Sequence, residues 1–155
     1  MEALKIDRKD IYRIPVVDIY GNDNGDYLEF DLQDISLPFR CLKSLEEVEK
    51  IKKQTQRKEA TILNRPNVQG KYISKNAEDI LKLWEKAFKD MRQAMDLFLG
   101  EGACEKIFKD KNYIKMYDDL SKVLDPYIDE MGLSFEKAKK QIVEKYGNKN
   151  KKVIQ

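Results

Sequence analysis

The fold is decided by residues 76–99, NAEDILKLWEKAFKDMRQAMDLFL, in which apolar side chains recur at steps of three and four residues. This period places the apolar side chains on one face of an α-helix. Asn76 is a suitable N-cap, and Gly100 stands where a glycine commonly ends a helix. We therefore expect a helix that forms the spine of the core and carries the only tryptophan. Its apolar positions are Ile80, Trp84, Ala87, Phe88, Met91, Ala94, Met95 and Phe98.

Ahead of this helix, two short segments have the composition of β-strands. Residues 11–20 are rich in β-branched and aromatic side chains, although Pro15 predicts an edge strand or a break. Residues 27–33 alternate between apolar and polar side chains, and the GNDNGD sequence at residues 21–26 contains the turn pair Asn-Gly. We expect a β-hairpin over residues 11–33 that lies on helices or on another chain, because two strands are not stable alone. The apolar side of its second strand comprises Leu28, Phe30 and Leu32.

A second helix is predicted between the hairpin and the spine. Ser44 and Glu47 form a capping box, in which each side chain can bond the other's free backbone amide. A narrow apolar seam follows, so we expect this helix to run from Ser44 to about Ala60. Residues 64–70 contain a proline and a glycine and predict a loop.

Beyond Gly100 the sequence predicts further short helices. A turn at residues 103–108 leads to a helix over about 112–124, which kinks or restarts at Asp125-Pro126 and ends at Gly132. A last helix opens at Ser134 and stops at Gly147. The apolar positions of the last helix are Phe135, Ala138, Ile142 and Tyr146.

These elements predict an α+β, mainly α fold in which an N-terminal β-hairpin precedes about four to five helices. The length of 155 residues suits one domain. We expect that domain to cover residues 1–147, with the hairpin at 11–33 and the helical part at 44–147. Residues 148–155 are expected to be a basic flexible tail.

The composition argues against catalysis. The chain has no histidine, which removes the commonest general base and the commonest transition-metal ligand. Cys41 and Cys104 lie far apart in the sequence, lack a Cys-x-x-Cys partner and are expected to be reduced thiols. The acidic turn has the glycine of a calcium loop, but Tyr20 stands where the first carboxylate ligand belongs. We expect no catalytic, cofactor-binding or metal-binding residues and no cofactor.

Charge is unevenly distributed along the chain. Between Ile14 and Phe39 there are six acidic residues and no basic one. Between Lys137 and Lys152 there are seven lysines and one acidic residue, Glu144. Such polarity acts on association more than on fold. We therefore expect a protein that binds other proteins and forms a weak homo-oligomer at low salt. Nucleic-acid binding by the basic tail is a less favoured alternative, because Tyr146 is the only aromatic residue among the lysines.

Residues 94–131 carry a pattern that resembles the tail assembly chaperones of long-tailed phages and prophages of Gram-positive hosts. Members of that family have a short acidic hairpin, a charged helix and a long helix that ends in a Phe-x-Gly-x-Gly turn followed by Lys, Ile or Leu, and Phe. Relatives commonly carry a glycine after the second phenylalanine, where this chain has Lys109. The residues that match the motif are Phe98, Gly100, Gly102, Lys106, Ile107 and Phe108.

The resemblance implies a non-catalytic protein that binds the tape measure protein and helps recruit tail tube subunits during virion morphogenesis. It also implies that the motif is a packing or partner-binding turn. Because no stretch is apolar enough to span a bilayer and the N-terminus lacks a secretion signal, the expected location is the cytoplasm of the bacterial host. An adaptor or inhibitor encoded on a mobile element is a further alternative.

Overall fold

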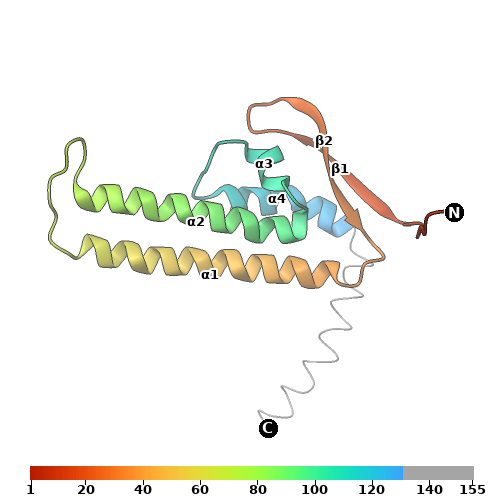
Figure 1. Ribbon diagram of the computed structural model, residues 1–155, viewed down its shortest axis with the longest axis horizontal. Helices are drawn as coiled ribbons and strands as arrows, with labels where there is room; N and C mark the ends of the chain where they lie inside the picture. The colour runs from red at the N-terminus through yellow and green to blue at the C-terminus, as the bar shows by residue number, and fades with distance from the viewer. Residues whose placement is uncertain (131–155) are drawn as a thin grey trace, which may run out of the picture.

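The structure is a computed structural model, and it describes residues 1–130 (Figure 1). Two strands, β1 (Ile11–Val17) and β2 (Asp23–Asp31), precede two long helices, α1 (Leu37–Leu63) and α2 (Lys75–Leu99). A short helix α3 (Ala103–Phe108) and a helix α4 (Met116–Glu130) follow. The expected class, α+β and mainly helical with an N-terminal hairpin, is confirmed. The helix expected from Ser134 and the basic tail lie outside the described residues.

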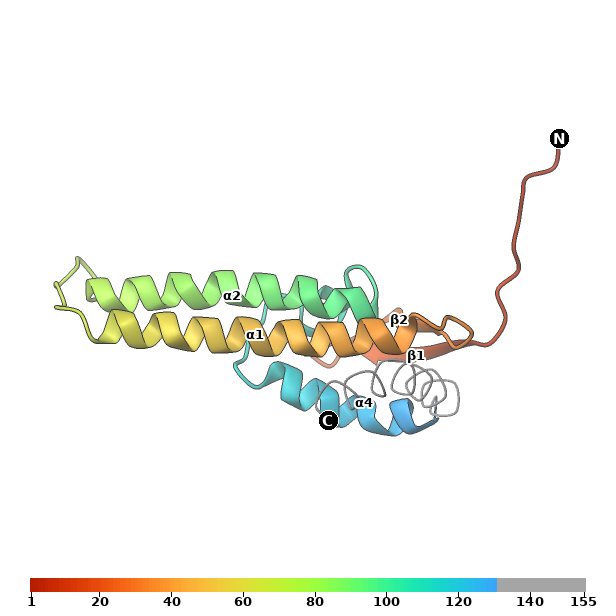
Figure 2. The same ribbon diagram turned by 90° about the horizontal axis from the view of Figure 1, so that it is seen from below.

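The long helices α1 and α2 form an antiparallel pair, and the remaining elements gather around one half of it. Figures 1 and 2 both show the hairpin, α3 and α4 beside the half where α1 begins and α2 ends. The other half projects as a two-helix arm closed by the loop between Leu63 and Lys75. No helix among the described residues is both long enough and apolar enough to cross a membrane.

The apolar face of the hairpin lies on α2, as the alternation predicts. The strands pair antiparallel with Ile14 opposite Leu28 and Tyr12 opposite Phe30. The side chain of Phe30 is 1% exposed, and its ring centroid lies 5.3 Å from that of Phe98. This contact supplies the apolar partner without which a two-stranded sheet is not stable.

The hairpin turn lies earlier in the chain than the sequence indicates. Asp18 is buried, and its carboxylate accepts hydrogen bonds from the backbone amides of Tyr20 and Asn22 and from the side-chain amide of Asn24. The Asn24-Gly25 pair therefore belongs to β2, where Gly25 has a φ of 76° and the register between the strands shifts. Because the Asp18 carboxylate binds amide groups of Tyr20, Asn22 and Asn24, it determines where the chain reverses. The Asn-Gly pair therefore forms an irregularity in the strand instead of the turn.

The prediction of a capping box at Ser44 and Glu47 is wrong. Helix α1 begins at Leu37, with Ser36 as N-cap and Pro38 in the first turn, where proline is well tolerated. Ser44 is fully buried inside the helix, and its hydroxyl has no hydrogen-bond partner. The helix extends back to Leu37 because its first turns continue the buried face, which comprises Leu37, Pro38, Cys41, Ser44, Val48 and Thr55.

Helix α2 forms the expected spine, although Ser74 rather than Asn76 caps it. The Ser74 side chain accepts a hydrogen bond from the Ala77 amide at 3.2 Å. Asn76 is buried and binds Arg65, which fixes the loop between the two long helices. Trp84 is only half buried and donates its indole N–H to Glu59 on α1. The centre of the core therefore lies farther along α2, at Met91, Met95, Phe98 and Leu99.

Helix α4 begins at Met116, four residues after the expected start, and runs through Asp125-Pro126 without a break. The expected restart at this pair is therefore wrong. Pro126 is exposed, so water can satisfy the Lys122 carbonyl that would otherwise bond the missing amide. The late start has a tertiary cause, because Arg92 on α2 binds the carbonyl of Lys111 and the side chain of Asn112.

The buried Ser44 hydroxyl gives a test of the α1 boundary. A capping serine that is replaced by alanine costs about 1 kcal/mol. Because the Ser44 hydroxyl is unpaired and lies inside the helix, we expect Ser44→Ala to leave the free energy of unfolding unchanged or to raise it by up to about 1 kcal/mol. Denaturant unfolding measures the change. Ser74→Ala is the matched control and should lower the free energy of unfolding by about 1 kcal/mol. Equal losses in both variants would show that Ser44 caps the helix after all.

Candidate interaction site at the glycine turn

The glycine turn joins α2 to α3 through two residues with positive φ. Gly100 has a φ of 110° and Gly102 a φ of 75°, and no atom beyond the adjacent residues lies within 4 Å of the position that a Cβ would take at either. Conformation rather than space therefore requires glycine here, since side chains rarely adopt these angles. The Gly100 amide still donates to the Asp96 carbonyl, and this hydrogen bond completes the last helical turn of α2.

The carboxylate of Asp96 organises the start of α3. Its two oxygens accept hydrogen bonds from the Gly102 amide at 3.2 Å and the Cys104 amide at 3.0 Å. A carboxylate that satisfies the free amides at the start of a helix is stabilising there. Sequence reasoning missed Asp96, although an acidic residue six positions before the second glycine is a possible signal.

The two aromatic residues of the motif are buried. Phe98 is 5% exposed and lies on Phe30 of the hairpin. Phe108 is 6% exposed, and its ring meets that of Tyr117 on α4 edge-on at 6.3 Å between centroids. The motif therefore joins the hairpin to α2 and α3 to α4, which favours the packing role among the two roles expected for it.

The other two motif residues, Lys106 and Ile107, are partly buried beside the hairpin. The Ile107 carbonyl accepts a hydrogen bond from the Ile19 amide at 2.8 Å. Lys106 lines a shallow hollow between the start of β2 and the glycine turn. The structure thus brings all six motif residues to the junction of the hairpin, α2 and α3.

A second set of contacts fixes the hairpin turn to the residues after α3. The Tyr20 hydroxyl donates a hydrogen bond to the Asp110 carboxylate, and the Lys111 ammonium lies 5.7 Å from the centre of the Tyr20 ring. The hydrogen bond raises the pKa of Tyr20 and lowers the pKa of Asp110. The position of the turn therefore depends on the chain beyond α3 as well as on α2.

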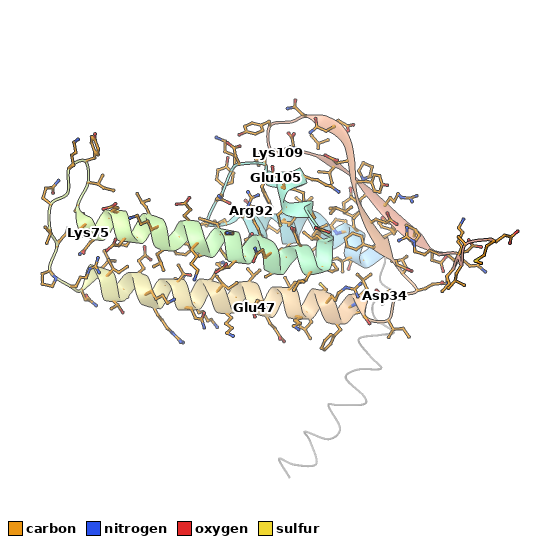
Figure 3. The ribbon with its side chains drawn as sticks, in the orientation of Figure 1. Asp34, Glu47, Lys75, Arg92, Glu105 and Lys109 are labelled. Carbon is orange, nitrogen blue, oxygen red and sulfur yellow. The ribbon has the colours of Figure 1, made fainter. Side chains whose placement is uncertain are left out.

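Arg92 on α2 connects the same region from the opposite side. Its guanidinium donates to the Lys111 carbonyl at 2.6 Å and to the Asn112 side chain at 3.0 Å, and it lies 3.6 Å from the Glu105 carboxylate. Figure 3 shows Arg92 on α2 and Glu105 on the neighbouring helix α3, near the middle of the view. No local pattern in the sequence indicates these contacts, because the partners lie 13 to 20 residues away.

Lys109 adopts a backbone conformation that favours glycine. Its φ is 51° and its ψ is −127°, and it ends α3 directly after Phe108. The lysine therefore occupies this conformation at the cost of backbone strain.

The two cysteines are poor nucleophiles. Burial raises the pKa of Cys41 to about 11, and burial together with the nearby Asp96 carboxylate raises the pKa of Cys104 further. A thiol with a raised pKa is protonated at neutral pH and is therefore unreactive. Within residues 1–130, no group of histidine, cysteine, aspartate and glutamate side chains is arranged to hold a metal ion.

Several acids of the hairpin region have partners. Arg8 lies 2.6 Å from Glu29, and Arg40 lies 2.5 Å from Asp34. The Asn22 amide that donates to Asp18 holds the pKa of that carboxyl below its usual range. The surface acidity expected from the sequence is therefore smaller than the count of six acids suggests.

The outer side of α1 carries a second feature, which we call the α1 apolar row. Four large side chains at spacings of four, three and three residues are 45–66% exposed. Phe39 lies about half a turn round the helix from Leu37, and the steps of three residues carry the row back toward the buried face, so that Leu45 lies at the edge of that face. The row comprises Ile35, just before the helix, and Phe39, Leu42 and Leu45 within it. Sequence reasoning missed Ile35, Phe39 and Leu42 because the helix was expected to begin at Ser44.

The burial of Phe108 predicts a stability effect. Phe108→Ala should lower the free energy of unfolding by about 3–5 kcal/mol, because it removes a buried ring and leaves a cavity beside Tyr117. Thermal or denaturant unfolding measures the loss. Phe39→Ala, at a half-exposed position, should stay within about 1 kcal/mol of the parent. A Phe108 variant as stable as the Phe39 variant would contradict the packing role.

The strain at Lys109 predicts a gain from glycine. Relief of the strained conformation returns about 1–3 kcal/mol, and the greater freedom of glycine in the unfolded chain costs about 0.5–1 kcal/mol. We therefore expect Lys109→Gly to raise the free energy of unfolding by about 1 kcal/mol. Lys71→Gly, in a loop without positive φ, should lower it. A loss at both positions would show that Lys109 is unstrained.

Comparison with known proteins identifies a family. No curated protein and no solved structure matches the chain. A family model described as a family of unknown function, DUF6673, matches residues 24–155, which include β2 except its first residue and all four described helices. The chain therefore belongs to the DUF6673 family.

Proposed function

We propose that this protein is a non-catalytic tail assembly chaperone of a long-tailed phage, which binds the tape measure protein and helps recruit tail tube subunits. The observation that carries the proposal is the α1 apolar row, a set of exposed apolar side chains in the first turns of α1 and just before it. The motif that resembles the phage chaperones supports it, since the motif residues build the junction of the hairpin, α2 and α3. A tape measure chain is long, helical and apolar along its seams, so it needs such a cover.

The spacing of the row suits a helical client. Side chains separated by steps of three residues form an inclined ridge on a helix, and the apolar side chains of a second helix can pack beside such a ridge. The row is preorganised, because the buried side of the same turns is fixed in the core by Leu37, Cys41 and Val48. Preorganisation lowers the entropy that binding costs.

The magnitude of the interaction favours weak binding by each copy. Full burial of a large apolar side chain stabilises by about 1.5–3 kcal/mol, so four half-exposed side chains offer on the order of 3–6 kcal/mol. Association itself costs about 4–15 kcal/mol. One row therefore holds a client loosely, while several copies on one long chain reinforce one another. Loose contacts suit a chaperone that leaves the finished tail.

The proposal also predicts the position of the gene, and it competes with the nucleic-acid alternative. The gene for the chain should lie between a tail tube gene and a long tape measure gene. Nucleic-acid binding, the alternative considered from the sequence, depends on lysines beyond residue 130 and gains no support from the described residues.

Co-expression with the neighbouring tape measure protein tests the proposal. We expect the tape measure protein to be soluble with this chain and to aggregate without it. Leu42→Asp should weaken the purified complex at least about tenfold, because a charge replaces an anchor in the middle of the row. Titration of a labelled tape measure fragment measures the affinity.

Leu81→Asp is the matched control. Leu81 is 64% exposed on α2 and lies outside the row, so this variant should bind as the parent does. A tape measure protein that stays insoluble with the parent chain would contradict the proposed function. Equal weakening by both variants would contradict the row as the binding surface.

A further inference from the structure

We propose that residues 2–9, which we call the leading segment, pair as a β-strand with the free edge of β2 in a second copy of this chain. The segment precedes β1, and Figure 2 shows the start of the chain projecting away from the rest of the molecule. Its large apolar side chains, Leu4 and Ile6, are 96% and 84% exposed. They therefore contribute little to the stability of a single copy, and a partner that covers them gains from their burial.

The leading segment has the pattern of a strand with one apolar side. Leu4 and Ile6 alternate with Lys5 and Asp7, and residues 2–9 form neither helix nor strand in a single copy. A period of two places Leu4 and Ile6 on one face of an extended chain and the charged side chains on the other. The segment can therefore complete a strand where it meets an open sheet edge with an apolar floor beside it.

The outer edge of β2 is such an open edge. The sheet has two strands, so each strand has one side without a strand partner. β1 is the poorer template, because Pro15 lacks an amide and the Ile19 amide just beyond the strand already binds the Ile107 carbonyl of α3. β2 contains no proline, and within the described residues it pairs with β1 alone. A row of unpaired backbone groups is a template for another chain.

A groove follows this edge, between β2 and the end of α2. It consists of two shallow hollows of about 300 and 400 Å³, and Glu29 and Gly100 line both of them. Neither hollow is lined by a residue of β1, so both lie on the β2 side of the sheet. Leu97 on α2 lines the larger hollow and is 56% exposed. A strand paired with β2 would lay Leu4 and Ile6 over this floor.

Charge selects the leading segment as the occupant. β2 contains four acidic side chains and no basic one, so two β2 edges that met would repel each other. The leading segment contains three basic and two acidic side chains, which makes it net positive. In a single copy its Arg8 already lies 2.6 Å from Glu29 of β2. Basic side chains of this segment thus suit the acidic edge, and the same edge excludes a second β2.

The connection to β1 is too short for a copy to fill its own groove along its full length. The free side of β2 lies two strand spacings, or about 10 Å, from β1. The chain from Lys9 to Ile11 spans at most about 7 Å. The whole segment therefore reaches a groove only in another copy. Two copies can exchange their segments reciprocally, which gives a closed dimer with two-fold symmetry, the commonest kind of oligomer.

Sedimentation velocity of the full-length protein over a concentration series tests the inference. We expect a dimer in the parent, and Ile6→Asp in the segment and Leu97→Asp in the groove should each raise its dissociation constant at least about tenfold. Both side chains are more than half exposed, so neither change should unfold the monomer. Leu81→Asp is the matched control, because Leu81 is 64% exposed on α2 outside the groove, and this variant should dimerise as the parent does.

A disulfide between two variants tests the position of the segment. In a mixture of the Ile6→Cys and Leu97→Cys proteins, we expect the two to be joined at least about tenfold faster than in a mixture of Ile6→Cys with Leu81→Cys. The native thiols, Cys41 and Cys104, are buried, so they should contribute little to this reaction. Neither measurement requires a client, so the dimer holds or fails separately from the proposed function.

The inference would be overturned by a parent that stays monomeric at every concentration. It would also be overturned by a dimer that Ile6→Asp and Leu97→Asp leave unchanged, or that all three aspartate variants weaken equally. A disulfide that forms no faster than in the control mixture would contradict the position of the segment. A monomeric chain with both Ile6→Cys and Leu97→Cys that closes an internal disulfide would show that each copy covers its own groove.

Discussion

The contact between Phe30 and Phe98 is the constraint on which the arrangement depends. A two-stranded hairpin has no partner for its inner face, so the end of α2 must provide one. Phe98 does this from the last turn of α2, and the glycine turn that follows sends the chain back toward the hairpin. There the Ile107 carbonyl accepts the Ile19 amide, so the hairpin is held by side chains at one point and by backbone at another.

The polar contacts at this junction come from the same helix. Asp96 and Arg92 lie one turn apart on α2 and bind successive parts of the chain that follows, α3 through Asp96 and the residues after α3 through Arg92. Asp96 pairs the amides of Gly102 and Cys104 and Arg92 pairs the carbonyl of Lys111, so backbone groups on both sides of a short helix are satisfied. Helix α2 therefore sets the position of every element at this end, and a helix as short as α3 needs that support.

The sequence predicted the features that depend on periodicity and missed those that depend on distant residues. Alternation in β2 and the helical period of α2 identified Leu28, Phe30, Met91 and Phe98 as core residues, because burial itself imposes those periods. Local end signals failed where tertiary packing was stronger. The predicted capping box at Ser44 does not form, because the buried face of the helix already begins at Leu37. The sequence indicated the glycine motif but not the residues that bind around it, Asp96 and Arg92.

Burial separates the two surfaces that could serve function. The motif phenylalanines are enclosed, so a partner could reach them only by opening the core, at a cost of several kcal/mol for each buried ring. The apolar row on α1 is already partly exposed, and a partner gains from covering it without opening anything. Variation within the motif should therefore act first on stability. Under the proposed function, affinity for a client should instead follow the exposed side of α1, because a change there leaves the core intact.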